Sequence, residues 1–211
     1  MNISILGAGR VGSNLARALA ERGHHIVLGQ RDPQAGASKW QGPPLQHATL
    51  AEAAAASPLV IHATPGDTAL QTLSALEPAL AGKILLDVAN ATVRLANGMP
   101  GPLCYPNSSL AEQIQAALPQ TQVVKALNTM LFSVMTAPQS LTTAPTAFIS
   151  GNHATAKTQV HALLLELGWP EDWILDLGNL ESARATEALI LLAPHLIAAK
   201  GFKPFALSAA Y

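Results

Sequence analysis

The feature that most constrains this chain is its start, where an apolar run ends in spaced glycines and an amphipathic segment follows. The apolar run is Ile3–Leu6, and the glycines, in the spacing G-x-G-x-x-G, are Gly7, Gly9 and Gly12. In a strand–turn–helix unit these glycines permit the tight turn, let the backbone approach a pyrophosphate, and let the helix lie close to the sheet. The chain therefore predicts a dinucleotide-binding unit at its N-terminus.

The segment after the glycines has the features of the helix and second strand of such a unit. Val11, Leu15 and Leu19 recur at helical spacing, and a second apolar run, Ile26–Leu28, follows. The alternative is a glycine turn that only reverses the chain. Free N–H groups at a helix N-terminus attract phosphate. The residues expected to contact the cofactor phosphates are Gly7, Ala8, Gly9, Arg10, Val11 and Gly12.

The end of the second strand indicates which dinucleotide binds. An acidic residue there usually holds the ribose 2′-OH of NAD, whereas NADP needs a cation beside its 2′-phosphate. Gln30 stands where the acid is expected, and Arg31 can bind a phosphate bidentately. We therefore expect NADP(H). The alternative is that Arg31 is an exposed loop charge and that Asp32 caps a helix beginning at Pro33.

The bulk composition limits the kinds of protein this chain can form. Hydrophobic residues make up 49% of the 211 residues and charged residues only 12%, which predicts that a second subunit covers part of the surface. We therefore expect a homodimer. The formal net charge of −1 gives no field for nucleic acid or for an anionic membrane, so neither partner is expected.

Other features bear on location and on metals. The first strand begins at residue 2 or 3, which leaves no room for a signal peptide, and Cys104 is the only cysteine. The apolar run Ala188–Ala199 is too short to cross a bilayer. We expect a cytoplasmic protein. The scattered spacing of the seven histidines predicts no metal site.

Alternating apolar runs and helical segments predict an α/β fold with a doubly wound, mostly parallel Rossmann sheet. We expect residues 1–178 to form this sheet and its helices, and residues 179–211 to form a small helical extension of the same compact unit. Asp67 should cap a helix that runs to about Ala81, and residues 91–107 should form a lid-like loop. The later strands are expected at Leu59–Ala63, Ile84–Asn90, Val123–Thr129, Ala147–Gly151 and Trp173–Gly178.

Small or polar residues follow two of these strands at their carboxyl ends, where ligands bind in open α/β sheets. Ala63, Thr64 and Pro65 should border the cofactor. Asn90 is a candidate for the nicotinamide side. His62 could donate a proton, but a single histidine in an apolar strand is more often a hydrogen-bonded core residue.

The strand near residue 125 brings two further polar residues to the same edge. Lys125 and Asn128 are predicted to touch the cofactor or the substrate. For Lys125 the alternative is an ion pair with a carboxylate at the sheet edge. No side chain is assigned a catalytic role.

Seven segments together resemble the NADPH-dependent F420 reductase family, that is, the F420H2:NADP oxidoreductases and their bacterial dinucleotide-binding relatives. They are spread over almost the whole chain and read ILGAGRVG, VLGQRDP, IHATP, LLDVAN, VVKALNTM, FISGNHATAK and DLGNLESARATEAL. The resemblance implies a Rossmann domain with a small C-terminal portion, homodimers, and direct hydride transfer between NADP(H) and a deazaflavin.

The resemblance also implies roles for particular residues. Gln30 and Arg31 match a Ser/Thr-Arg pair that holds the 2′-phosphate, with glutamine as a departure from the pattern. Ala63, Asn90 and Asn128 match strand-end positions that line the nicotinamide and the acceptor.

The electron acceptor is left open between F420 and a flavin. Direct transfer between two rings asks little of side chains, which suits a sequence poor in acid–base candidates. One alternative is a reductase of a small carbonyl or imine, which needs a proton donor. Another is a non-catalytic NADP sensor that uses the dinucleotide to set its assembly state, and that binds NADPH without passing its hydride to any acceptor offered.

Overall fold

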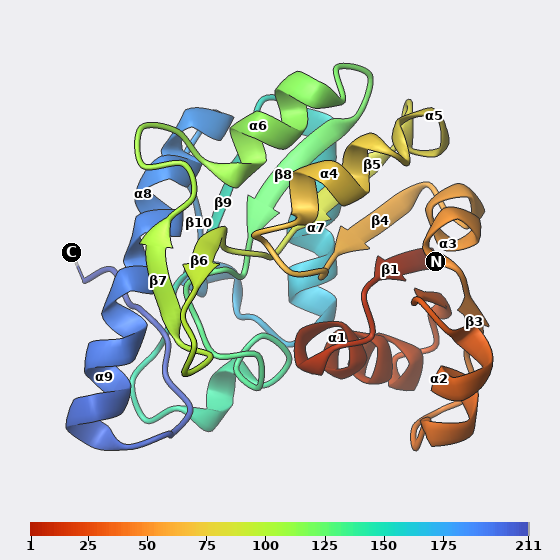
Figure 1. The fold of residues 1–211 in the computed structure, drawn as a ribbon. Coiled ribbons are helices and arrows are strands. Elements are labelled where there is room, and N and C mark those ends of the chain that lie inside the picture. The colour runs from red at the N-terminus through yellow and green to blue at the C-terminus, as the bar shows by residue number, and fades with distance from the viewer. Residues whose placement is uncertain (211) are drawn as a thin grey trace.

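The computed structural model describes residues 1–210 and shows an eight-stranded sheet with helices packed on both faces (Figure 1). Its strands are β1 (Asn2–Leu6), β2 (His25–Gly29), β3 (Gln46–Ala48), β4 (Leu59–His62), β5 (Ile84–Asp87), β8 (Gln122–Ala126), β9 (Ala147–Gly151) and β10 (Ile174–Asp176). Their order across the sheet is β10-β9-β8-β5-β4-β1-β2-β3. All neighbours pair in parallel except β8 and β9, which are antiparallel. The predicted mostly parallel Rossmann fold is confirmed.

Two apolar cores lie on the two faces of this sheet. One core contains side chains of α1 and α7, and the other contains side chains of α3 to α6. The helices are α1 (Arg10–Glu21), α2 (Pro33–Lys39), α3 (Leu50–Ala56), α4 (Ala69–Ser74), α5 (Glu77–Leu80), α6 (Leu110–Ala117), α7 (Ala154–Glu166), α8 (Ala183–Ala188) and α9 (Ala193–Lys200). Strands β4 and β5 are buried along their whole length, as the apolar runs Leu59–Ile61 and Ile84–Leu86 favour, and each strand ends in a buried polar residue, His62 or Asp87.

The helix predicted from Asp67 to Ala81 is wrong in two respects. The segment forms two short helices, α4 and α5, and Pro78 lies in the first turn of α5, where a missing N–H costs nothing. Thr68 precedes α4, and no side chain caps that helix. Asp67 instead lies 3.6 Å from Arg94 in a partly exposed ion pair.

The predicted loop at residues 91–107 contains regular structure. It includes a two-stranded antiparallel hairpin formed by β6 (Thr92–Arg94) and β7 (Pro100–Leu103). The hairpin stands beside the carboxyl ends of the central strands (Figure 1). It is therefore one wall of the region where a ligand is expected, which agrees with the predicted position of a covering segment.

The C-terminal portion is helical from Leu180 to Lys200, as predicted, with 3₁₀ turns at Leu180–Ser182 and Leu189–Leu192 around α8. Pro194 lies in the first turn of α9 and so begins this helix. The chain then returns along the segment after β8, where Leu131 N–H donates to the Phe205 carbonyl at 2.9 Å. Division into residues 1–178 and 179–211 remains a prediction. Within residues 1–210 no helix is both long and apolar enough to cross a membrane.

Candidate functional site: a cleft at the carboxyl ends of the central strands

The turn between β1 and α1 shows why it needs glycine. Gly7 has a φ of +108°, and a Cβ there would lie 2.6 Å from the Ala63 carbonyl oxygen. A Cβ on Gly12 would lie 1.8 Å from the Gly7 oxygen, so the helix could not approach the sheet. Gly9 has nothing within 4 Å of the place where its Cβ would be. Two glycines therefore permit the fold, and the third leaves open space at the N-terminus of α1 that a pyrophosphate can occupy.

After the end of β2, the adjacent side chains of Gln30 and Arg31 lie in different environments. The Gln30 amide Nε2 donates to His47 Nδ1 at 2.7 Å, and a Cβ on Gly36 would lie 2.0 Å from that same nitrogen. Burial lowers the pKa of His47, which favours the neutral ring that can accept this bond. Arg31 is exposed and makes no hydrogen bond or ion pair with the rest of residues 1–210. Its guanidinium is therefore available for a phosphate.

A cleft of about 360 Å³ lies at the carboxyl ends of β4, β5 and β8. Five of the predicted residues line it, namely Arg10, Val11, Thr64, Asn90 and Asn128. Its remaining wall is largely apolar and comes from the β6–β7 hairpin, the segment after β8 and the C-terminal portion; it includes Met99, Met130, Leu131, Phe132, Met135, Ile190, Ala193, Ile197, Phe202 and Phe205. The cleft has room for a planar ring against an apolar surface.

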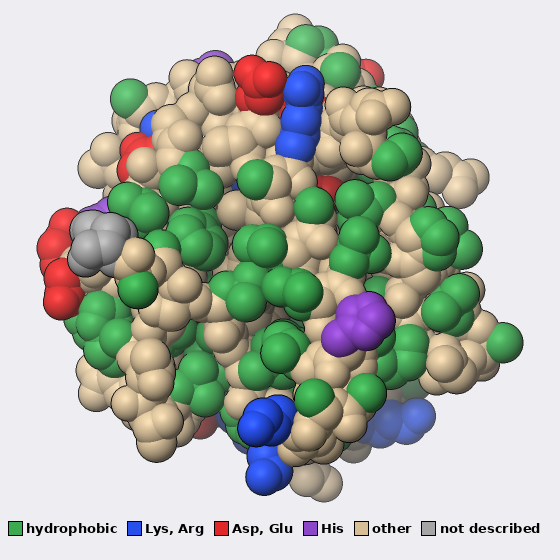
Figure 2. Space-filling view, turned by 90° about the vertical axis from the view of Figure 1, so that its left-hand side faces the viewer, with side chains coloured by type: hydrophobic (Ala, Val, Ile, Leu, Met, Phe, Trp, Pro, Cys, Tyr) green, Lys and Arg blue, Asp and Glu red, His purple; other side chains and the backbone are tan. Residues whose placement is uncertain are grey.

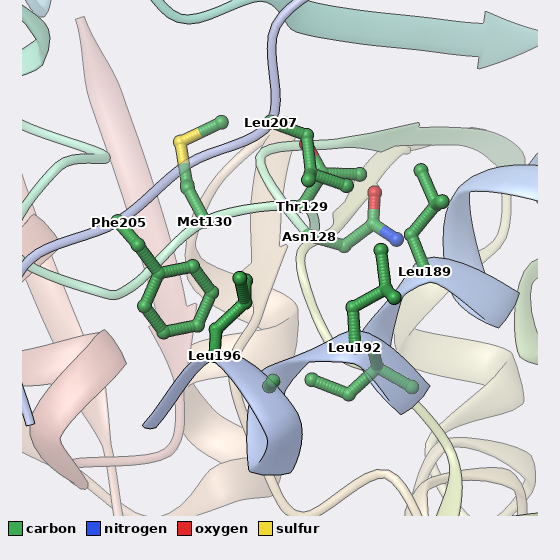
Figure 3. A pocket seen from close by; sticks show the side chains of 10 residues that line it. Asn128, Thr129, Met130, Leu189, Leu192, Leu196, Phe205 and Leu207 are labelled. Carbon is green, nitrogen blue, oxygen red and sulfur yellow. The ribbon is translucent and has the colours of Figure 1, made fainter. Parts of the chain in front are cut away.

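Asn90 and Asn128 hold two strand ends together at the floor of the cleft. Asn128 Nδ2 donates to Asn90 Oδ1 at 2.9 Å, and Asn90 Nδ2 donates to the Asn128 carbonyl at 2.7 Å. The residue before, Leu127, has a φ of +62°, in the left-handed region that non-glycine residues rarely adopt. Figure 3 shows Asn128 and Phe205 among the side chains that line a small adjoining cavity of about 20 Å³ beneath the C-terminal helices.

Lys125 lies outside the cleft, in a buried ionic cluster. Its ammonium lies 2.8 Å from Asp87 Oδ2 and 2.7 Å from Glu187 Oε1, and it also donates to the Ala89 carbonyl. Its side chain is 1% exposed. The carboxylate of Glu187 also accepts the first two backbone N–H groups of α6, at 2.8 and 3.2 Å. The alternative of an ion pair is confirmed, in the interior of the sheet, and cofactor contact by Lys125 gains no support from this position.

The charges of this cluster shift one another's pKa values. Burial alone would raise the pKa of Asp87, but the Lys125 charge and the hydrogen bond from His62 outweigh burial and hold that pKa well below its ordinary value. Burial alone would lower the pKa of Lys125, but the charges of Asp87 and Glu187 outweigh burial and raise it. Asp87 is therefore an ionised carboxylate.

A chain of hydrogen bonds leads from Asp87 to the cleft. His62 Nδ1 lies 2.8 Å from Asp87 Oδ1, and His62 Nε2 lies 2.6 Å from Thr64 Oγ1. His62 is fully buried, as the alternative to proton donation requires, and Thr64 is 9% exposed at the cleft wall. Ala63 and Pro65 flank Thr64 but do not line the cleft.

Sequence reasoning missed residues from the C-terminal portion. Glu187, Phe202 and Phe205 were not predicted to belong to the site, although Glu187 contacts Lys125 and both phenylalanines line the cleft. The signal for Glu187 was weak: it is the one acid in the apolar stretch 185–194. Nothing in the local sequence of Phe202 and Phe205 indicates that the chain returns to β8.

The fold and this cleft together define a Rossmann-type dinucleotide-binding protein. Comparison with known proteins carries the assignment further. The family described as NADP oxidoreductase coenzyme F420-dependent matches residues 2–91. A crystal structure of a candidate F420-dependent NADP-reductase from Arthrobacter sp. FB24 is 38% identical, covers 100% of both chains and superimposes with a TM-score of 0.89. The chain belongs to this family of NADP-dependent oxidoreductases, which confirms the resemblance in its sequence.

Two other relatives place the chain more broadly. A hypothetical protein of Sinorhizobium meliloti is 28% identical over 87% of this chain and 88% of its own, with a TM-score of 0.69. Metalloreductase STEAP3 of Rattus norvegicus is 32% identical over 190 residues, which are 90% of this chain. The chain matches only 36% of the length of that metalloreductase.

Proposed function

We propose that this protein transfers a hydride between NADPH and a deazaflavin (F420) or flavin acceptor. The observation that carries the proposal is the largely apolar cleft of about 360 Å³ that begins at Arg10 and Val11, in the first turn of α1. Direct transfer requires two rings to be held in contact, because the cofactors themselves carry the chemistry. Phe132, Met99 and Phe205 supply an apolar surface of this kind.

The proposed cofactor site follows the order of the strands. The pyrophosphate lies over the β1–α1 turn, at Gly7, Ala8, Gly9, Arg10, Val11 and Gly12. The 2′-phosphate binds Arg31, with Gln30 holding the neighbouring backbone through His47. The nicotinamide half extends the other way, past Ala63, Thr64 and Pro65 towards Asn90 and Asn128. NADP(H) supplies the hydride when it is bound there.

A homodimer and a cytoplasmic location are part of the same proposal. Leu191 and Leu192 are 41% and 44% exposed, and Phe202 is 62% exposed. Figure 2 shows hydrophobic side chains gathered on the face of the molecule that carries these C-terminal elements. Apolar surface of this kind favours a second copy of the chain. A single half-buried cysteine suits a reducing compartment.

The deciding experiment measures NADPH oxidation by the purified protein with F420, FMN, riboflavin, ferric chelates and small carbonyls as acceptors. We expect turnover with F420 or with a free flavin, and slow oxidation without any acceptor. Tight NADPH binding with no turnover on the whole panel would point to the sensor and contradict the proposal.

One observation favours a second candidate, reduction of a small carbonyl or imine. Such a substrate needs a positioned proton donor, and the hydrogen-bond chain from Asp87 through His62 to Thr64 ends in the cleft. Turnover confined to the carbonyls of the panel, or to imines added to it, would select this candidate.

A further inference from the structure

The Thr64 hydroxyl is held by a buried histidine on one side and meets the cleft on the other. Its Oγ1 lies 2.6 Å from His62 Nε2, and the other ring nitrogen of His62 lies 2.8 Å from Asp87 Oδ1. His62 and Asp87 are both fully buried. The hydride transfer proposed above makes no use of either residue.

The partners of His62 determine where its protons lie. An ionised Asp87 can only accept hydrogen bonds, so Nδ1 of His62 carries a hydrogen. In the neutral ring Nε2 then has a lone pair, and the Thr64 O–H must donate to it. The hydroxyl hydrogen points inward, and Thr64 presents only acceptor lone pairs to the cleft. When His62 gains a proton, Nε2–H donates instead, and the hydroxyl hydrogen becomes free to point into the cleft.

The order of the strands decides which half of the dinucleotide reaches Thr64. β1 lies between β2 and β4, with the pyrophosphate turn at its end and Arg31 after β2. The half that carries nicotinamide must therefore extend towards β4. Thr64 follows β4 and is adjacent to the turn, because a Cβ on Gly7 would lie 3.0 Å from the Thr64 nitrogen.

We infer that the His62–Asp87 pair sets the polarity of the Thr64 hydroxyl, which accepts a hydrogen bond from the carboxamide N–H of nicotinamide while His62 is neutral. Thr64 is the binding residue, and His62 and Asp87 are positioning residues. The inference rests on the proposed binding of NADP(H).

The groups around His62 are consistent with this arrangement. Asp87, on β5, is the one charged group that contacts the ring among residues 1–210. Lys125, on β8, contacts the other oxygen of Asp87, and Glu187, on α8, contacts Lys125. Arg10 lies at the cleft wall. Each of these charges acts on His62 through Asp87 or across the cleft, so the orientation of the imidazole is set by its one carboxylate.

The test compares the dissociation constants of NADP⁺ and its 3-acetylpyridine analogue. The analogue keeps the carbonyl oxygen of the carboxamide but lacks its N–H. Wild type should bind NADP⁺ more tightly by roughly three- to tenfold. Both ligands share the 2′-phosphate, so its contribution cancels in the ratio.

Four variants separate the roles. Thr64→Val removes the hydroxyl and should give a ratio near one, whereas Thr64→Ser should restore the wild-type ratio. His62→Gln can donate to Asp87 and accept from Thr64, so the ratio should stay as in wild type. Thr158→Val, at an exposed hydroxyl on α7, is the matched control and should behave as wild type.

Two results would overturn the inference: a wild-type ratio near one, or Thr64→Val that still discriminates between the ligands. The Thr64 variants decide it even if His62→Gln does not fold. A wild type that fails to bind NADP⁺ at all contradicts the proposed function instead, and so the two failures are distinguishable.

Discussion

At the scale of single residues, the site divides into side chains that are free to meet a ligand and side chains already occupied by the protein. Arg31 is exposed and without a partner in residues 1–210, whereas the Gln30 amide is held by His47. Lys125 is enclosed by two carboxylates and a carbonyl. Charge alone therefore does not identify a binding residue, and the decisive property is the availability of the charged atoms.

Arg31→Ala should weaken NADPH binding by on the order of ten- to a hundredfold and leave NADH binding nearly unchanged. The reason is that only NADPH carries the 2′-phosphate proposed to contact the guanidinium. The measurement is fluorescence or calorimetric titration with each dinucleotide. Lys39→Ala removes an exposed cation at the end of α2. It is the control and should alter neither affinity. Equal losses for both dinucleotides would contradict the assignment of Arg31.

Lys125→Met should destabilise the fold by about 3–5 kcal/mol, since it leaves Asp87 and Glu187 buried without a cation. The free energy of unfolding in urea measures this loss. Lys83→Met is the control, because Lys83 donates only to two backbone carbonyls at the end of α3 and is partly exposed. A loss no larger than that of the control would show that the cluster contributes little.

The same substitution should change the response to acid. The folded pKa of Asp87 is depressed, so its contribution to stability is full above the unfolded value of about 3.9 and is lost as pH falls towards the folded value. Without Lys125 the burial of Asp87 raises this pKa. Acid unfolding of Lys125→Met, followed by circular dichroism, should therefore begin at a higher pH than that of wild type, after correction for its lower stability at pH 7.

How far the sequence predicts such residues depends on the distance between partners along the chain. Arg31 follows the second strand directly, so local pattern is enough to place it. The carboxylates of Lys125 lie 38 and 62 residues away, and no local pattern reports them. His62 could be recognised as a core histidine from its apolar strand. Its link to Asp87 could not be predicted, because the two residues lie far apart along the chain, and its link to Thr64 was not predicted either.

At the scale of elements, the glycines in the turn between β1 and α1 have different roles. Gly12→Ala should destabilise the protein, because the added methyl would lie 1.8 Å from a backbone oxygen. Gly9→Ala should fold with nearly wild-type stability, since nothing lies within 4 Å of its Cβ position. We expect Gly9→Ala to weaken NADPH binding strongly, because the methyl occupies the space proposed for the pyrophosphate. Thermal unfolding and NADPH titration of both variants measure the two effects, and tight binding by Gly9→Ala would contradict this role.

The elements that could be predicted are those with a local cause. The strand–turn–helix unit follows from the apolar run and the glycines, and the box of Thr49 and Glu52 caps α3 as its sequence indicates. The break between α4 and α5 was missed, although Pro78, in the first turn of α5, is a local signal for it. The β6–β7 hairpin and the return of the chain to Leu131 depend on pairing between distant segments, which periodicity does not reveal.

At the scale of the whole molecule, the C-terminal portion joins the cleft to the exposed apolar face. Ile190, Ala193 and Ile197 line the cleft, while Leu191 and Leu192 are exposed between them. The same helical turns therefore present one side to the proposed acceptor and another to the surface seen in Figure 2. A second subunit on that face would cover apolar area and support the cleft wall from behind.

This arrangement leads to a prediction about assembly. Sedimentation at micromolar concentration should show a dimer for wild type, and Leu192→Glu should shift the protein towards the monomer, because a carboxylate placed in an apolar interface loses its water without gaining a partner. Leu165→Glu is the matched control: Leu165 is 40% exposed on α7 and should leave the dimer intact. Circular dichroism of each variant should match wild type, so that a change in mass reports association and not unfolding. A wild-type monomer, or a dimer that Leu192→Glu leaves intact while Leu165→Glu disrupts it, would move the interface away from the C-terminal helices.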